Sequence, residues 1–224
     1  WSGDVASTWE SFRKQICAGM NMGMAGISWW TTDIGGFYGG NIEDPEFKKL
    51  LLRWFQWGTF CPVMRLHGAR QPKTDHYNSK GELILDEGAP NEIWSYGSEL
   101  EALFAKYIKI REIMRPYTRS LMETTHKTGE PVLRPMFYDF PKDANTWEPK
   151  DQYMFGPDIL VAPVVEPDVS TRTVYLPEGN WKHLFTGEEF TGGCSYTIST
   201  PKEEIPVFLR NGSHAEWIDA IKNL

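Results

Sequence analysis

The sequence predicts an α/β first half followed by an all-β second half. Residues 1 to 127 contain buried apolar runs that alternate with helical apolar periodicity, whereas later residues form short apolar runs between Gly and Pro turns. At 224 residues, the chain is long enough for one or two domains with a substantial core. We therefore expect two units, residues 1–127 and residues 128–224, of which the second is an antiparallel β-sandwich.

The composition argues against several classes of protein. The net charge is −7 and no basic run is present, so nucleic acid is not an expected partner. No run of about 18 apolar residues occurs, so we expect no membrane span. The three cysteines, Cys17, Cys61 and Cys194, are spaced for neither a zinc site nor a disulfide framework, and we expect them to be buried thiols.

The first helix is predicted to begin at a capping box formed by Ser7 and Glu10. Gly23 ends the helical pattern, and residues 25–30 then form an apolar run that predicts a buried strand ending at Asp33. The apolar residues of the helix recur at the spacing of one helical face, at Trp9, Phe12, Ile16, Cys17 and Met20.

A second helix is predicted from Asp44 as N-cap and Pro45 as first helical residue. A second buried strand is predicted over residues 60–66. The polar stretch that follows, residues 68–91, has about 24 residues and exceeds most structural connections, which favours a functional rim or lid. A third helix is predicted over residues 98–126, with a kink at Pro116.

Alternating helices and strands are typical of a parallel sheet covered by helices, but two clear strands are too few for a stable sheet of their own. The second half offers five strand-like runs bounded by turn residues such as Gly156-Pro157 and Gly192-Gly193. The predicted strands cover residues 132–140, 158–165, 172–176, 180–184 and 203–209.

Three polar residues stand where parallel strands are predicted to end, which is where α/β sheets place their chemistry. They are Asp4, Asp33 and His67. Each has a structural alternative: Asp4 as a turn cap, Asp33 as an ordinary Asx turn, and His67 with Arg65 as an ion-paired sheet edge. The three together are a stronger indication of a site than any one alone.

The aromatic content of 14% suggests which ligand such a site takes. Trp and Tyr rings stack on the apolar faces of sugars, and carboxylates with His and Arg bind hydroxyl groups. Paired carboxylates are also the usual machinery of glycoside cleavage. No G-x-S-x-G, G-x-G-x-x-G or phosphate-binding loop is present, and a metal site from Asp33, His67 and His76 has no ligand spacing to support it.

Six motifs, in order along nearly the whole chain, resemble glycoside hydrolase family 31, the family of α-glucosidases and α-xylosidases. Three lie in the first half: W-S-G-D at residues 1–4, W-T-T-D-I-G-G-F at residues 30–37, and R-L-H-G at residues 65–68. Three lie in the second half: L-R-P-M-F-Y-D-F-P at residues 133–141, Q-Y-M-F-G-P-D-I-L-V-A-P-V at residues 152–164, and Y-L-P-E-G-N-W at residues 175–181.

The resemblance implies the C-terminal part of a (β/α)8 TIM barrel, strands six to eight, followed by the proximal β-sandwich. It implies that Asp4 is the general acid/base, that Asp33 and Phe37 line the sugar-binding subsite, and that His67 binds sugar hydroxyls. Trp30 is expected to shape the pocket wall, and Arg65 to support the strand end. The implied partner is an α-glycoside substrate, and the chemistry needs no metal or organic cofactor.

One departure from the family pattern determines what we expect of this chain. The family's nucleophile is an Asp on the fourth barrel strand, upstream of the W-S-G-D motif, and the chain begins at that motif. We therefore expect a fragment that lacks the nucleophile, needs the N-terminal part of the same enzyme as its partner, and has little hydrolase activity alone. The R-L-H-G form resembles bacterial members, including α-xylosidases.

Two other hypotheses stay open at the level of sequence. The chain could be a non-catalytic carbohydrate-binding or structural piece, or a distinct hydrolase that uses Asp4 and Asp33 as its complete pair. The choice between glucose and xylose, the linkage, the localisation and any homo-oligomeric state are also left open.

Overall fold

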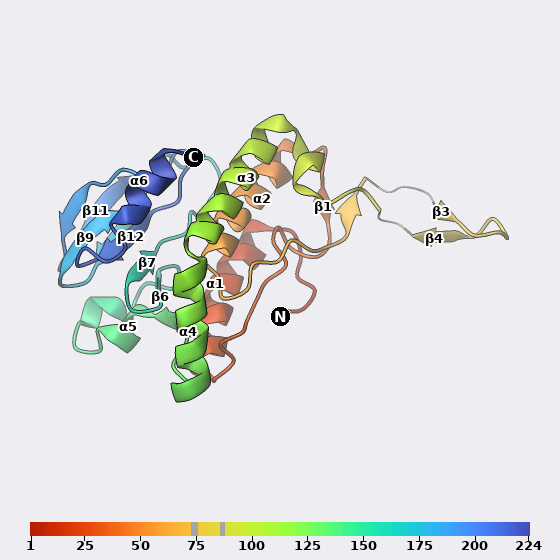
Figure 1. The fold of residues 1–224 in the computed structure, drawn as a ribbon. Coiled ribbons are helices and arrows are strands. Elements are labelled where there is room, and N and C mark those ends of the chain that lie inside the picture. The colour runs from red at the N-terminus through yellow and green to blue at the C-terminus, as the bar shows by residue number, and fades with distance from the viewer. Residues whose placement is uncertain (73–75, 86–87) are drawn as a thin grey trace.

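A computed structural model describes residues 1–72, 76–85 and 88–224 of the chain. Figure 1 shows the helices α1 to α4 in the middle of the molecule and the C-terminal β-strands on one side of them. A thin hairpin formed by β3 (His76–Tyr77) and β4 (Leu83–Leu85) projects from the other side. This hairpin lies within the long polar stretch that the sequence predicts over residues 68–91.

The first helix, α1, covers Trp9–Met24 and buries Phe12, Ile16 and Met20 as predicted. Its N-cap is Thr8, whose hydroxyl accepts a hydrogen bond from the Ser11 amide at 3.1 Å. The predicted capping box of Ser7 and Glu10 is therefore wrong by one position.

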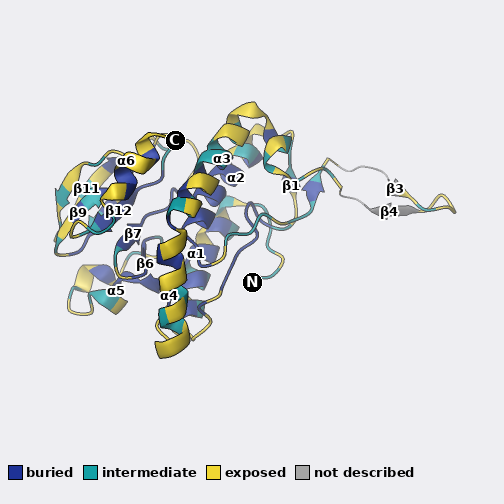
Figure 2. Cartoon of the chain, viewed as in Figure 1, coloured by how far each residue is buried: buried dark blue, intermediate teal, exposed yellow. Residues whose placement is uncertain are grey.

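Helix α2 covers Pro45–Thr59, and its start is as predicted. The Asp44 carboxylate accepts a hydrogen bond from the Glu46 amide at 2.9 Å, and Pro45 occupies the first helical turn. The helix packs against α3 and is buried over much of its surface, including both tryptophans, Trp54 and Trp57 (Figure 2).

The predicted third helix is two helices, α3 (Ser98–Ile113) and α4 (Arg115–Thr128). The break falls at Met114, two residues before Pro116, which confirms the predicted interruption because proline has no amide to donate to the preceding turn. A short 3-10 turn, η1 (Ile93–Tyr96), precedes α3.

The two buried strands predicted in the first half are not regular strands. Trp30 and Phe60 are buried, yet regular pairing begins later, where β1 (Gly40–Asn41) lies parallel to β2 (Arg70–Gln71). Burial is only partial in these runs, because Ile27, Trp29 and Val63 are 49%, 69% and 39% exposed. An apolar run therefore does not by itself make a strand, since ladder pairing also needs a neighbouring strand in register.

A six-stranded antiparallel sheet dominates the second half. Its strand order is β10-β9-β12-β7-β6-β5, and a two-stranded ribbon of β8 and β11 packs on one face. The strands of the sheet are β5 (Leu133–Pro135), β6 (Tyr153–Phe155), β7 (Ile159–Val161), β9 (Asn180–His183), β10 (Glu189–Thr191) and β12 (Val207–Arg210). The ribbon consists of β8 (Thr171–Leu176) and β11 (Cys194–Ser199).

The second half therefore has the predicted antiparallel architecture, with three differences in its elements. The predicted strand over residues 132–140 becomes helical after Pro135, at α5 (Met136–Asp139). Strands β6, β10 and β11 lie outside the predicted runs. Two further elements were not predicted: the 3-10 turn η2 (Ala144–Thr146) and the C-terminal helix α6 (Glu216–Lys222).

Side-chain alternation along the sheet sends its two faces into different cores. In β6, Tyr153 and Phe155 pack with the helices, whereas Met154 packs with the ribbon. The Tyr153 hydroxyl also donates to the Phe60 carbonyl at 2.8 Å, across the two halves of the chain. The sheet and the helices thus share one hydrophobic core, and the helical half covers one face of the sheet.

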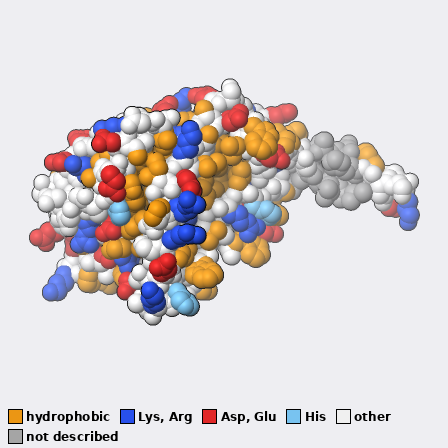
Figure 3. Space-filling view, in the orientation of Figure 1, with side chains coloured by type: hydrophobic (Ala, Val, Ile, Leu, Met, Phe, Trp, Pro, Cys, Tyr) orange, Lys and Arg blue, Asp and Glu red, His pale blue; other side chains and the backbone are white. Residues whose placement is uncertain are grey.

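The surface and the cysteines test two predictions from composition. On the face drawn in Figure 3, acidic and basic side chains are interspersed around a band of hydrophobic ones. Cys61 is buried, Cys17 is half-buried and Cys194 is exposed, so the expectation of buried thiols is wrong for Cys194.

Within the described ranges, no helix is long and apolar enough to cross a membrane, and no group of three His, Cys, Asp or Glu side chains could hold a metal ion.

Candidate active site

Three extended segments that are distant in sequence lie side by side and bring the predicted site residues together. Residues 1–7 contact residues 31–38, with the Phe37 amide donating to the Val5 carbonyl at 2.7 Å and a parallel bridge joining Ala6 to Tyr38. Residues 31–38 contact residues 65–70 in turn, because the Ala69 amide donates to the Phe37 carbonyl at 2.7 Å.

Asp33 is the most buried charged group at this edge, with an exposed fraction of 0%. Its Oδ1 lies 3.2 Å from Nε of Arg65. Neither carboxylate oxygen accepts a hydrogen bond of good geometry from the residues that the structure describes. A buried carboxylate that holds one ion pair and has unused acceptor sites is suited to binding hydroxyl groups of a ligand.

The charges around Asp33 show which side chains are close to it. Burial raises the pKa of the Asp33 carboxyl, and the positive charges of Arg65 and His67 oppose this effect. The negative charge of Asp4 raises the Asp33 pKa further. Asp4, Arg65 and His67 therefore lie within electrostatic reach of Asp33.

Phe37 and His67 form one side of this edge. Their ring centroids are 5.6 Å apart at an interplanar angle of 46°, and Phe37 is half-buried while His67 is exposed. The phenyl ring offers an apolar face beside a polar imidazole. A sugar ring presents the same combination of C–H faces and hydroxyl groups.

Asp4 is exposed and lies on the N-terminal segment. It follows Gly3, whose φ of +81° turns the chain in the left-handed region that glycine adopts readily. The neighbouring Trp1 ring is 63% exposed and carries the Arg65 guanidinium carbon 5.7 Å from its centroid. Arg65 therefore contacts both Trp1 and Asp33 and links the first segment to the second.

Trp30 occupies a different environment from the one expected for a pocket wall. Its side chain is 3% exposed, lies 5.9 Å from Trp57 between ring centroids, and packs so tightly on Gly19 that a Cβ there would be 2.8 Å from the indole. This is a core position. The adjacent Trp29 is 69% exposed.

Arg70 is a residue that the sequence analysis missed. Its side chain is 1% exposed and donates hydrogen bonds to Ile34 and Gly36 on the loop that carries Asp33 and to Ala69 on the loop that carries His67. The sequence feature that could have pointed to Arg70 is its place two residues after the R-L-H-G motif, at the start of the long polar stretch.

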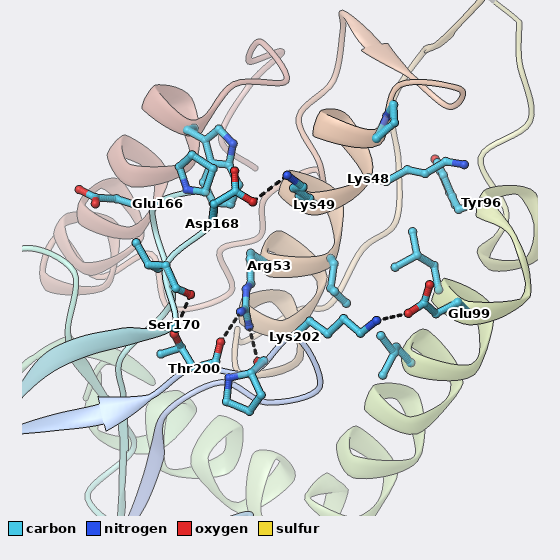
Figure 4. Close-up of a pocket in the computed structure, with 18 of the residues that line it drawn as sticks. Lys48, Lys49, Arg53, Tyr96, Glu99, Glu166, Asp168, Ser170, Thr200 and Lys202 are labelled. Carbon is cyan, nitrogen blue, oxygen red and sulfur yellow. Dashed lines mark hydrogen bonds and ion pairs between the residues drawn. The ribbon is translucent and has the colours of Figure 1, made fainter.

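A cavity of about 990 Å³ lies elsewhere, between α2, α3 and two loops of the β-half (Figure 4). Ion pairs span it: Lys49 contacts Asp168 at 2.7 Å, and Lys202 contacts Glu99. None of the predicted site residues lines this cavity. The edge that carries Asp4, Asp33 and His67 is instead open to solvent at Asp4 and His67, which are both exposed.

Comparison with known families supports the sequence motifs over both halves. Residues 1–121 match the glycosyl hydrolases family 31 TIM-barrel domain, and residues 129–213 match the glycosyl hydrolase family 31 C-terminal domain. Together these matches include all the predicted site residues.

Individual relatives give the same assignment. The chain is 39% identical to an α-xylosidase of Saccharolobus solfataricus over 95% of its length, and 35% identical to α-xylosidase A of Aspergillus niger over 93%. It spans 27% and 30%, respectively, of these two relatives. A solved family 31 α-xylosidase from a soil metagenome, complexed with xylose, is 51% identical with a TM-score of 0.91, over 99% of this chain and 33% of that one. The chain belongs to glycoside hydrolase family 31, with residues 1–121 matching its TIM-barrel domain and residues 129–213 matching its C-terminal domain.

Proposed function

We propose that this chain forms the C-terminal portion of a retaining α-glycosidase that removes terminal α-linked xylosyl or glucosyl residues from the non-reducing end. The observation that carries the proposal is the approach of Asp4, Asp33 and His67 across three parallel segments. Relatives named as α-xylosidases and an α-glucosidase support the substrate class, and the chain spans only 24–30% of their lengths.

In this proposal, Asp4 is the general acid/base. A nucleophilic carboxylate from a part of the enzyme outside this chain attacks the anomeric carbon, and Asp4 gives its proton to the departing glycosidic oxygen. In the second step Asp4 takes a proton from water, which attacks the same carbon and releases the sugar from the nucleophile. Two displacements at one carbon return the original anomeric configuration.

Asp33, His67 and Phe37 hold the sugar while Asp4 reacts. The unused acceptor sites of the Asp33 carboxylate and the exposed imidazole of His67 suit sugar hydroxyls. The Phe37 ring, 5.6 Å from the imidazole between centroids, suits an apolar sugar face. Trp30 supports this arrangement from the core, through Gly19 and Trp57, instead of contacting the sugar.

Several exposed apolar side chains support a partner that covers the same edge. Trp1, Ile27, Trp29 and Val63 are 63%, 49%, 69% and 39% exposed, and all belong to the three segments or lead into them. Large exposed apolar groups of this kind mark interaction surfaces. We propose that the remaining barrel strands of the enzyme cover them and bury Asp4, which an acid active near neutral pH requires.

Two measurements test the proposal. The complete enzyme should hydrolyse nitrophenyl α-xyloside or α-glucoside, and proton NMR should show the α-anomer as the first product; initial release of the β-anomer would reject the retaining mechanism. The 224-residue chain alone should show no turnover above the uncatalysed rate. Robust turnover by the chain alone would overturn the proposal that the active site needs a nucleophile from outside this chain. Sugar binding without hydrolysis by the complete enzyme would instead favour a non-catalytic carbohydrate-binding role.

A further inference from the structure

Arg70 is a charged side chain inside the protein, and its surroundings are unusual. Its exposed fraction is 1%, and among the described residues its hydrogen bonds run to neutral oxygens. Burying a guanidinium is costly unless its donors are used, and Arg has five of them in a rigid planar fork. The identity of the acceptors therefore shows what this buried charge accomplishes.

Two of the acceptors lie beside the proposed sugar-binding residues on one loop. Nη2 donates to the carbonyl of Ile34 at 2.9 Å, and Nη1 donates to the carbonyl of Gly36 at 3.0 Å. Ile34 follows Asp33 directly and Gly36 precedes Phe37 directly. The guanidinium thus holds the backbone on both sides of Gly35, inside the D-I-G-G-F turn.

The same guanidinium also holds the loop that carries His67. Nη1 donates to the carbonyl of Ala69 at 3.2 Å. Nε donates to Asn91 Oδ1 at 3.1 Å and to the Tyr96 hydroxyl at 3.2 Å, and the Asn91 amide in turn donates to the Gly68 carbonyl at 3.3 Å. Loops from the second and third segments are therefore fastened to one planar group.

Glycines shape the space that receives this group. A Cβ on Gly35 would lie 3.1 Å from Nη2 of Arg70, and a Cβ on Gly68 would lie 2.7 Å from Nη1. Both glycines have positive φ angles, +87° and +139°. The Phe47 ring also lies 5.2 Å from the guanidinium carbon. Backbone groups and the side chains of Phe47, Asn91 and Tyr96 therefore enclose the guanidinium.

We propose that Arg70 is a positioning residue that sets Asp33 and Phe37 on one loop and His67 on the other to face the same sugar. The inference rests on the proposed function for its catalytic consequence, but its structural part stands independently. Lysine offers a single ammonium and cannot reach carbonyls in two directions at these distances. A displacement of about 1 Å in such a site lowers activity by about 10²-fold.

The structural part is tested in the 224-residue chain by amide hydrogen exchange. Arg70→Met should accelerate exchange at Phe37 and Ala69, whose amides join the three segments, at least about tenfold more than at amides of the six-stranded sheet. Arg53→Met is the matched control, because Arg53 also donates to several carbonyls, at Thr200, Pro201 and Glu204, but beside the distant cavity. Equal acceleration at all amides would overturn the proposal.

The catalytic part is tested in the complete enzyme with Arg70→Lys, which keeps the charge and provides a milder variant if Arg70→Met does not fold. KM should rise and kcat/KM should fall about 10²-fold, equally for substrates with good and poor leaving groups. A normal KM with a reduced kcat would indicate a smaller folded fraction and overturn the positioning role, as would wild-type values of both. If the unmodified enzyme cleaves neither glycoside, the proposed function fails while the exchange experiment still decides the role of Arg70.

Discussion

The Nε atom of Arg65 lies 3.2 Å from Oδ1 of Asp33, and the aspartate is fully buried while the arginine is about one-third exposed. Breaking a pair of this kind leaves the inner charge without compensation. We expect Arg65→Met to destabilise the chain by about 1–3 kcal/mol at neutral pH, below the value for a fully buried pair because water screens the guanidinium. Urea unfolding at pH 7 measures it.

The pH dependence of that loss identifies Asp33 as its cause. Burial raises the Asp33 pKa, so the folded protein accepts a proton there more readily than the unfolded chain does. Without Arg65 the Asp33 pKa should rise further. The cost of Arg65→Met should then be largest at neutral pH and shrink as the pH falls through the raised pKa. In an Asp33→Asn background Arg65→Met should cost less, and equal costs in both backgrounds would show that the pair is not coupled.

For the complete enzyme, the loss of rate in Asp4→Ala should depend on the leaving group of the substrate. Removing a general acid costs about 10²–10⁴-fold on substrates whose leaving group needs a proton, and far less on activated aryl glycosides. Azide should partly restore turnover by occupying the space that the carboxylate leaves. Asp44→Ala is the control, because this exposed aspartate caps α2 and its loss should change stability without changing the leaving-group ratio. Wild-type rates on natural disaccharides would reject the role of Asp4.

Gly36 should be required for the contact between the first two segments. A Cβ on Gly36 would lie 2.8 Å from the backbone of Ser7, whereas a Cβ on Gly39 would have nothing within 4 Å, and the φ angles are similar at +80° and +85°. Gly39→Ala should cost about 1 kcal/mol for its conformation alone. Gly36→Ala should cost about 1–3 kcal/mol more because of the clash. Equal thermal stabilities for the two variants would show that the close approach is not maintained in solution.

Local sequence signals predicted the helices well and failed where distant backbone contacts intervene. The start of α2 depends on Asp44 and Pro45 alone, and it was predicted correctly. The start of α1 was misplaced because Ser7 donates its amide to the Tyr38 carbonyl at 2.9 Å and so belongs to the extended segment, which leaves the capping to Thr8. A capping motif cannot reveal which of two adjacent hydroxyl residues another segment has already engaged.

The same reasoning separates the site residues that the sequence could and could not predict. Asp33 and His67 closely follow apolar runs and Asp4 follows W-S-G, so the expectation that all three share one edge could be drawn from the order of these segments. Arg70 binds carbonyl oxygens of distant residues, and because every residue has a carbonyl, such partners leave no pattern in the sequence. Trp29 and Trp30 are adjacent and of the same residue type, yet Trp29 is exposed and Trp30 is buried. Trp30 is the one that packs on Gly19 of α1, and the local sequence does not show which of the two does so.

His183, at the end of β9, should make the stability of the chain sensitive to mild acid. Burial lowers its pKa from 6.5 to about 4, and its Nε2 has no hydrogen-bond partner among the described residues. The unfolded chain binds a proton at this histidine below about pH 6.5, but the folded chain does not until about pH 4. Stability should therefore decrease as the pH falls through this window, by about 3 kcal/mol in total. In His183→Leu, the pH profile should be flatter by that amount. His126→Gln, at an exposed position near the end of α4, should keep the wild-type slope, and an unchanged slope in His183→Leu would show that His183 is not the group responsible.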